Sequence, residues 1–176
     1  MDSMRLTVSL AALAVLASCA SLSESECRKG AWYDIGLTDG ARGQRSSYIA
    51  EHSMACGEFG ITPDAHEWHR GREAGLNQYC TAANAYFVGT TGTRLSPVCR
   101  EEDANALQLA NLRGLNWHRI GREIDKTSQE IREINTQLAK LPADSAERAS
   151  LVLRQGFLRL EILNLQAQRT HYRFRH

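Results

Sequence analysis

The sequence predicts an all-α protein, in which a small disulfide-linked module of short glycine-rich helices is followed by a long antiparallel helical hairpin. Two observations carry this prediction. Residues 27–99 hold four cysteines and most of the 13 glycines of the chain. Residues 100–176 hold no cysteine, are rich in Leu, Ile, Gln, Arg and Glu, and repeat apolar residues at alternating steps of three and four, which is typical of packed helices.

Length and charge limit the classes of protein that the chain can belong to. With 176 residues, it holds one domain or one small domain with an appendage. Its 21 Lys and Arg nearly balance its 20 Asp and Glu, so the net charge is +1. A nucleic-acid-binding protein normally carries a basic excess. We therefore expect no nucleic-acid partner.

The first 18 residues have the layout of a secretory signal peptide. Arg5 precedes an apolar stretch over residues 6–16, and the small residues Ala17 and Ser18 follow. A basic start, a short apolar stretch and small residues before the cleavage point are the three parts of such a signal. The apolar stretch is shorter than the roughly 20 residues that a membrane-spanning helix needs.

Cys19 ends a sequence, Leu-Ala-Ser-Cys, that looks like a bacterial lipobox. We expect cleavage before Cys19, a diacylglycerol on its thiol and an acyl chain on its new amine, with residues 19–26 as a lipidated linker. Several acyl chains together hold a protein almost permanently on a bilayer. The alternative is a secreted protein in which Cys19 is incidental. Ala20 stands where an Asp would favour the inner membrane, which favours the outer membrane and its periplasmic face.

Lipidation of Cys19 leaves an even number of cysteines. Cys27, Cys56, Cys80 and Cys99 would form two disulfides in an oxidising compartment, and four cysteines allow three connectivities. We favour the sequential pairs, Cys27–Cys56 and Cys80–Cys99, over the other two connectivities. A zinc site is the competing interpretation, but the intervals of 29, 24 and 19 residues contain no paired CxxC spacing.

Residues 27–99 contain a weak internal repeat, in which an aromatic residue leads two or three glycines at helical spacing. Such glycines predict short helices with bare faces that another backbone can approach, and some of them could instead mark turns, as in Thr38-Asp39-Gly40. The clearest helix is predicted to start with Thr62 as its N-cap and to run to Tyr79. The repeat consists of Trp32 with Gly36, Gly40 and Gly43, Trp68 with Gly71 and Gly75, and Tyr86 with Gly89 and Gly92.

Residues 100–176 predict two antiparallel helices and a basic, aromatic tail. The first, over residues 117–141, should end at Pro142, and a capping box of Asp144 and Glu147 should start the second, over residues 145–165. The second helix has the wider apolar face, and an exposed stripe on it would imply a protein partner or self-association. The first helix carries a coiled-coil-like seam of Trp117, Ile120, Ile124, Thr127, Ile131, Ile134, Leu138 and Leu141.

Three histidine and glutamate side chains are the other candidates for a metal site. His66, His69 and Glu73 stand at i, i+3 and i+7, so they share one face of the predicted helix. Two imidazoles and a carboxylate can hold zinc with an open position. However, the spacing is not that of the H-E-x-x-H motif, and Arg70 and Arg72 disfavour a nearby cation. We expect no metal and no other cofactor.

Several segments of the chain together resemble an uncharacterised family of bacterial lipoproteins classed only as a domain of unknown function. The first is W-x3-G-x2-DG-x2-G, which begins at Trp32 and lies between Cys27 and Cys56. The others are ITPDAHEWHRGREAGLNQYC, over residues 61–80, and NAYFVGTTG followed by VC, over residues 84–99. The resemblance covers about residues 27–99 well and the helical tail loosely. It implies an envelope lipoprotein and supplies no catalytic residue.

These observations predict a non-catalytic lipoprotein of the bacterial outer membrane, with an envelope structural or partner-binding role. The membrane contact would come from the lipid on Cys19, and a protein contact from the helices over residues 117–141 and 145–165. The alternative is a metal-dependent or cell-wall-active enzyme with its site near His66, His69 and Glu73.

Overall fold

The structure, a computed structural model, describes residues 21–174. Within this range all regular structure is helical, which confirms the predicted all-α class. The predicted signal peptide and Cys19, the predicted site of lipidation, lie outside the described residues. The elements are α1 (Glu24–Lys29), α2 (Trp32–Ala41), the 3-10 helix η1 (Ser46–Tyr48), α3 (Ile49–Gly57), α4 (Ala65–Tyr79), α5 (Ala82–Thr90), α6 (Glu101–Leu138) and α7 (Ala146–His171).

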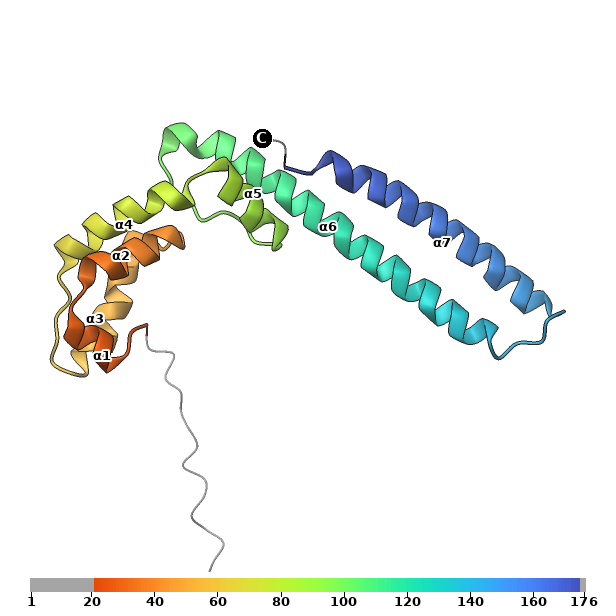
Figure 1. The fold of residues 1–176 in the computed structure, drawn as a ribbon, viewed down its shortest axis with the longest axis horizontal. Coiled ribbons are helices and arrows are strands. Elements are labelled where there is room, and N and C mark those ends of the chain that lie inside the picture. Colours follow the sequence, from red (N-terminus) through yellow and green to blue (C-terminus); the bar gives the residue numbers. More distant parts are fainter. Residues whose placement is uncertain (1–20, 175–176) are drawn as a thin grey trace, which may run out of the picture.

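The molecule is elongated, with the short helices at one end and the hairpin at the other (Figure 1). Helices α1 to α4 gather into one cluster, and α5 lies beside the first part of α6. The 38 residues of α6 then run out to the far end, about 57 Å at 1.5 Å per residue. Helix α7 returns antiparallel along it. Because α6 packs on both α5 and α7, it joins the two halves of the fold.

The two disulfides have the sequential pairing that we favoured. Cys27–Cys56 joins α1 to α3, and Cys80–Cys99 joins the end of α4 to the segment just before α6. The first bridge is fully buried in a small core that also contains Leu22, Trp32 and Trp68. A core of this size is marginal on its own, so the bridges contribute to stability by restricting the unfolded chain.

Glycines let the backbones of α2 and α4 touch. A methyl group on Gly36 would overlap the carbonyl oxygen of Trp68, and one on Gly40 would overlap that of Arg72. The contact is reciprocal, since a methyl on Gly71 or Gly75 would overlap backbone atoms of α2. The predicted glycine faces are therefore confirmed here, and the alternative of a turn at Thr38-Asp39-Gly40 is wrong, because these residues lie inside α2.

The same device joins α5 to α6. Gly89 on α5 and Gly114 on α6 face each other, and a methyl group on either would overlap the backbone of the other helix. Gly92, just past the end of α5, has a φ of +84°, which an L-residue with a side chain rarely adopts. The glycines of this chain thus serve both as helix contacts and as helix stops.

Helix α4 begins two residues later than the sequence predicted. Its N-cap is Asp64, whose side chain accepts a hydrogen bond from the backbone N–H of Glu67 at 3.0 Å. The predicted N-cap, Thr62, is exposed and lies outside the helix. Asp and Thr are both good caps, so the sequence between them did not distinguish the two starts.

The hairpin buries the predicted seam but has different ends. No seam residue of the first helix is exposed, and Ile120, Thr127 and Ile134 are buried against α7. However, α6 ends at Leu138 rather than at Pro142, and Arg148 of α7 donates hydrogen bonds to the carbonyl oxygens of Leu138 and Leu141 in the turn. The N-cap of α7 is Ser145, not Asp144, and α7 continues to His171 instead of ending at residue 165.

Helix α1 begins with a complete capping box. The Ser23 hydroxyl and backbone N–H both donate to the Glu26 carboxylate, at 2.6 Å and 2.8 Å. These two hydrogen bonds, the hydroxyl's first, lower the pKa of Glu26 below its ordinary value of 4.5 because they stabilise the charged form. When the pKa of a carboxyl group is lower in the folded state than in the unfolded state, the group stabilises the fold at pH values above the unfolded-state pKa. This stabilisation is lost as the pH falls through the folded-state pKa.

We expect Ser23→Ala to raise the pKa of Glu26, because it removes the larger of the two causes. An NMR titration of the Glu26 side chain measures this directly. Ser53→Ala is the matched control, since Ser53 lies on another helix, α3, where its exposed hydroxyl donates to the carbonyl oxygen of Ile49. An unchanged Glu26 pKa in Ser23→Ala would contradict the capping geometry.

Candidate functional site

A buried polar network connects the beginning of the described chain to the core of the module. His52 Nε2 lies 2.7 Å from Asp39 Oδ2, and the indole N–H of Trp68 donates to the same oxygen at 2.9 Å. The other ring nitrogen, His52 Nδ1, lies 2.9 Å from the hydroxyl of Ser21. His52, Asp39 and Trp68 are 1%, 6% and 0% exposed. The network therefore links α2, α3 and α4 to the segment just before α1.

Ser21, His52 and Asp39 are the residue types of a nucleophilic triad, but their setting is structural. Both nitrogens of the His52 ring are engaged, and the ring is enclosed by Trp68 and Tyr48, whose centroids lie 6.1 Å and 5.0 Å from its own. A general base needs hydrogen-bond access to its substrate. What the network does is fix Ser21, together with the buried Leu22, to the module.

Sequence reasoning had singled out neither His52 nor the network. Asp39 stood in a quoted motif, but there its only assigned role was in a turn or on a glycine face. The four residues are separated by 18, 13 and 16 positions and come from different elements, so no local spacing joins them. The one feature of the sequence that could have indicated the network is Asp39, because it stands next to Gly40, on the face of α2 that packs against α4.

The three residues weighed as candidate metal ligands, His66, His69 and Glu73, are not brought together. His66 is almost fully exposed, with Nδ1 3.5 Å from Glu67, and Glu73 pairs with the guanidinium of Arg72 at 2.7 Å. The ring of His69 packs edge-on against Trp68. Within residues 21–174, no group of three or more His, Cys, Asp or Glu side chains is placed to hold a metal ion.

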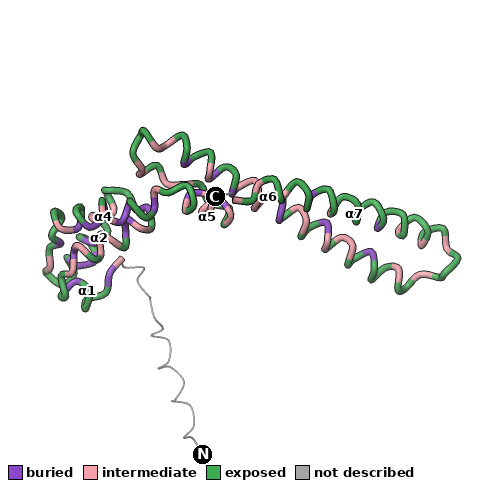
Figure 2. The backbone as a smooth tube through the Cα atoms, turned by 45° about the horizontal axis from the view of Figure 1, so that its top comes forward, coloured by how far each residue is buried: buried purple, intermediate pink, exposed green. Residues whose placement is uncertain are grey.

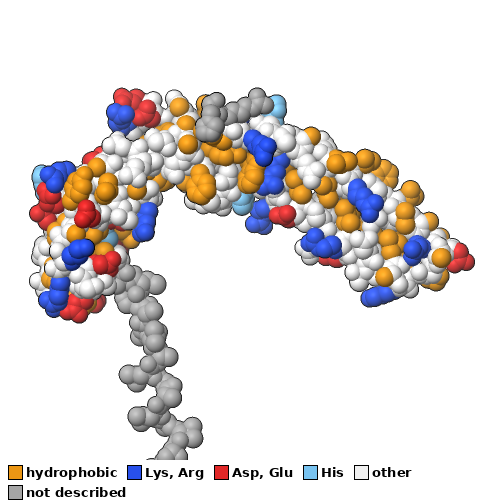
Figure 3. Space-filling view, viewed as in Figure 1, with side chains coloured by type: hydrophobic (Ala, Val, Ile, Leu, Met, Phe, Trp, Pro, Cys, Tyr) orange, Lys and Arg blue, Asp and Glu red, His pale blue; other side chains and the backbone are white. Residues whose placement is uncertain are grey.

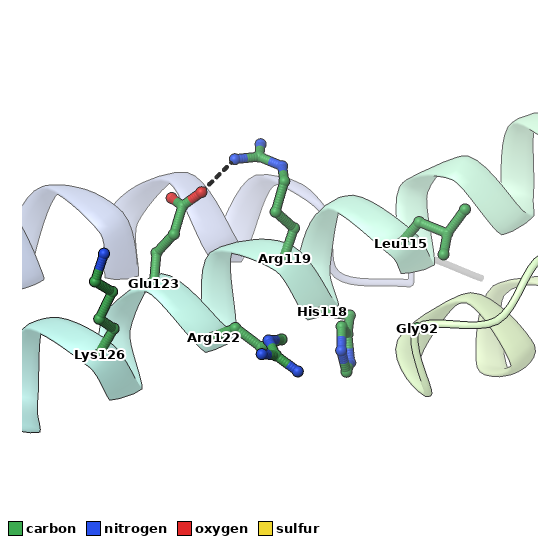
Figure 4. A pocket seen from close by; sticks show the side chains of 7 residues that line it. All are labelled: Gly92, Leu115, His118, Arg119, Arg122, Glu123 and Lys126. Atoms are coloured by element: carbon green, nitrogen blue, oxygen red, sulfur yellow. Dashed lines mark hydrogen bonds and ion pairs between the residues drawn. The ribbon is translucent and has the colours of Figure 1, made fainter.

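An open groove of about 590 Å³ lies along α6 beside the end of α5. Figure 4 shows that its charged side chains do not converge: Arg119 turns to Glu123, with which it forms an ion pair at 2.7 Å, and Lys126 lies a further turn away. His118 packs over Gly92, and its Nδ1–H donates to the carbonyl oxygen of Thr90 at 2.9 Å. The groove therefore offers no enclosed site for a small ligand.

The tail after α7 folds back on the middle of the molecule. Arg169 stacks over the Trp117 ring, 3.6 Å from its centroid, and Arg113 donates to the carbonyl oxygen of Arg173 at 3.1 Å. The ring of Phe174 lies 5.3 Å from that of Tyr86 on α5. These contacts fix the end of α7, so both helices of the hairpin are held at the module.

The side of α7 that points away from α6 is apolar and exposed. Leu153, Phe157, Leu160 and Leu163 have exposed fractions of 66%, 72%, 64% and 62%. Figure 2 shows buried positions only on the side of α7 that meets α6, and Figure 3 shows hydrophobic side chains along its outer edge. We define the outer face of α7 as its exposed residues Ala149, Val152, Leu153, Gly156, Phe157, Leu160, Leu163, Asn164 and Ala167.

The outer face carries no charge over its whole length. At 100° per residue, its nine members fall within a sector of about 140° around the helix, and they span about 27 Å. The charged residues of α7 lie at the edges of this sector or toward α6. Large contiguous apolar surface on a soluble helix marks an interaction site. The stripe that the sequence predicted for the second helix is thus present and exposed.

Comparisons with known proteins give a family match over part of the chain. No helix among residues 21–174 is both long and apolar enough to cross a membrane. Searches of the curated proteins and of the solved structures gave no significant match. The model of the DUF2799 family, described as a protein of unknown function, matches residues 31–115, from just before α2 to the first part of α6. The match covers the Cys- and Gly-rich helices from α2 onward and the start of α6, and the rest of the hairpin lies outside it.

Proposed function

We propose that the protein is a non-catalytic, lipid-anchored envelope protein whose module sits on the membrane and whose hairpin holds a protein partner. The observation that carries the proposal is the outer face of α7, which is exposed, uncharged and about 27 Å long. One apolar side of α7 is buried against α6, and a second apolar side is exposed to water. The sequence of α7 is therefore suited to packing against two neighbouring elements. The outer membrane and its periplasmic face are the proposed location.

The buried network supports the anchoring half of the proposal. Ser21 is fixed to His52 and Leu22 is buried in the core, so the ordered module begins two residues after Cys19. Two residues span at most about 7 Å. Acyl chains on Cys19 would therefore hold the module directly against the bilayer surface. The hairpin, attached through α6 at the other side of the module, would then extend away from the lipid attachment point (Figure 1).

A charged substitution on the outer face of α7 tests the proposed binding of a protein partner. We expect a photo-reactive residue in place of Leu153 of the full chain to form a crosslinked product in intact cells, and the added substitution Leu160→Asp to abolish it. An aspartate there would have to be desolvated in the contact. Leu109→Asp is the matched control, because Leu109 on α6 is 65% exposed and Leu160 is 64% exposed.

Two results would overturn this proposal. One is the absence of any crosslinked product from position 153. The other is a product that survives Leu160→Asp, because that contact would not depend on the apolar character of the outer face. Both aspartate variants should fold, since each replaced side chain is exposed in the isolated chain.

A further inference from the structure

Gly156 is an exception among the glycines in the helix interiors of residues 21–174. At each of the others, a methyl group would overlap a neighbouring helix or a side chain packed on it, as at Gly71 and Gly114, and Gly57, which is also open, is the last residue of α3. Gly156 lies in the middle of α7, on its outer face, and a methyl group there would meet nothing within 4 Å. A glycine inside a helix is destabilising relative to alanine, and no contact within the chain accounts for this one.

The outer face also has a symmetric spacing. Its central line runs Ala149, Leu153, Gly156, Leu160, Leu163 and Ala167, with steps of four, three, four, three and four. This series reads the same from either end and is centred on residue 158. A second α7 laid antiparallel over the first would therefore place alanine against alanine, Leu153 against Leu163, and Leu160 in the gap above Gly156.

A pair of charges beside the outer face fits the same arrangement. Arg154 and Glu161 lie outside the sector, about 60° and 40° beyond its edge at Phe157 and two turns apart, and their midpoint is again next to residue 158. In an antiparallel pair the two sides of the same kind meet, so the long side chains of Arg154 of one copy and Glu161 of the other would lie on the same side of the contact. Arg154 is also paired with Glu130 on α6, with its Nε 2.6 Å from the carboxylate.

From these three observations we propose that the partner of the outer face is a second copy of this chain, bound through an antiparallel contact of two α7 helices that is centred on residue 158, with Leu160 of each copy over Gly156 of the other. This proposal rests on the proposed function, because it names the occupant of the same face. Closed two-fold pairing is the commonest symmetry of protein oligomers, and it requires a self-complementary surface. The palindromic spacing provides such a surface.

Thiol crosslinking between two differently tagged full chains tests the pairing and its direction. One chain carries Ala149→Cys and the other Ala167→Cys, and cells making both are treated with a short, membrane-permeant bismaleimide. We expect a product of twice the chain mass that carries both tags. Either variant made alone should give little product, because its two introduced thiols would lie about 27 Å apart along the helices. The wild-type chain serves as the control for reaction at the native cysteines.

Two further variants show whether the outer face is responsible. Leu160→Asp added to both chains should abolish the two-tag product, whereas Leu109→Asp should leave it unchanged. Gly156→Leu should lower the yield about tenfold or more, as expected at the centre of an interface. The same variant should not lower the thermal stability of the dilute chain, since nothing lies near Gly156 in the monomer.

The possible failures are distinguishable. A product from either variant alone, and not from the mixture, would overturn the antiparallel contact. A Leu160→Asp-sensitive product of another mass would overturn the second copy as partner while leaving the proposed function in place. The bismaleimide reaches thiols on both sides of a membrane, so failure of the lipid anchoring would not by itself remove the two-tag product. No product in any combination would overturn the proposal.

Discussion

Asp39→Ala is expected to lower the free energy of unfolding by about 3–5 kcal/mol, the usual cost of removing one partner from a buried polar pair. The substitution leaves His52 Nε2 and the Trp68 indole N–H without their common acceptor in a region closed to water. A buried donor without an acceptor costs about 1–3 kcal/mol, so two of them account for most of this figure. Urea unfolding followed by the fluorescence of the three tryptophans, Trp32, Trp68 and Trp117, measures the loss.

Asp39→Asn is the matched comparison for this prediction. Its amide oxygen keeps one acceptor at the same place, so it should cost less than Asp39→Ala. The order of the three proteins, wild type above Asp39→Asn above Asp39→Ala, is the expected outcome. Equal stability of wild type and Asp39→Ala would mean that the network does not hold the module together.

Gly71→Ala is expected to destabilise the chain by about 2–3 kcal/mol, the upper part of the range for overpacking. Its methyl group would overlap the carbonyl group of Tyr33 and the backbone nitrogen of Leu37. Backbone of α2 cannot rotate away as a side chain can, so the two helices must separate. Separation also disturbs Trp68, which lies on the same face of α4 and donates to Asp39 on α2.

Gly156→Ala adds the same methyl group but is expected to stabilise the chain rather than destabilise it. Position 156 is open, so the added methyl group only improves helix propensity, by about 0.5–1 kcal/mol. Thermal unfolding of the two variants in dilute solution should therefore move the midpoint in opposite directions. A Gly71→Ala protein as stable as wild type would contradict the close contact of α2 and α4.

The features that the sequence predicted well are those encoded by local periodicity. The alternating steps of three and four from Trp117 to Leu138 identified the buried side of α6 correctly. The second apolar stripe on the following helix was visible for the same reason. The glycine spacing at Gly36, Gly40, Gly71 and Gly75 indicated bare helix faces, because few other structures justify that many helix-weakening residues.

The sequence did not show which faces pair or where α6 begins to pack. The repeat gave no reason why α2 should pair with α4 while α5 pairs with α6, since those choices depend on contacts between distant residues. The first part of α6 buries Asn111, whose amide donates to the carbonyl oxygens of Ala85 and Thr93. A polar residue at a buried position interrupts the apolar pattern, so the seam was traced only from Trp117 onward.

The candidate site was predicted only in part, for the same physical reason. An exposed apolar stripe follows from the period of one helix and can be read from consecutive residues. The network of Ser21, Asp39, His52 and Trp68 depends on tertiary packing, and each of its members has a plausible local role. A favourable local spacing can also mislead. It places His66, His69 and Glu73 on one face of a helix, but their side chains do not come together.

The attachment of lipid at Cys19 is the claim on which the account of location depends, and one measurement tests it most directly. The intact mass of the full chain isolated from the membrane fraction gives both its first residue and any acyl modification, with Cys19→Ser as the comparison. We expect a chain that begins at Cys19 and carries acyl chains, and a Cys19→Ser protein without them. A chain that begins at Met1, without acyl chains, in the soluble fraction would contradict it.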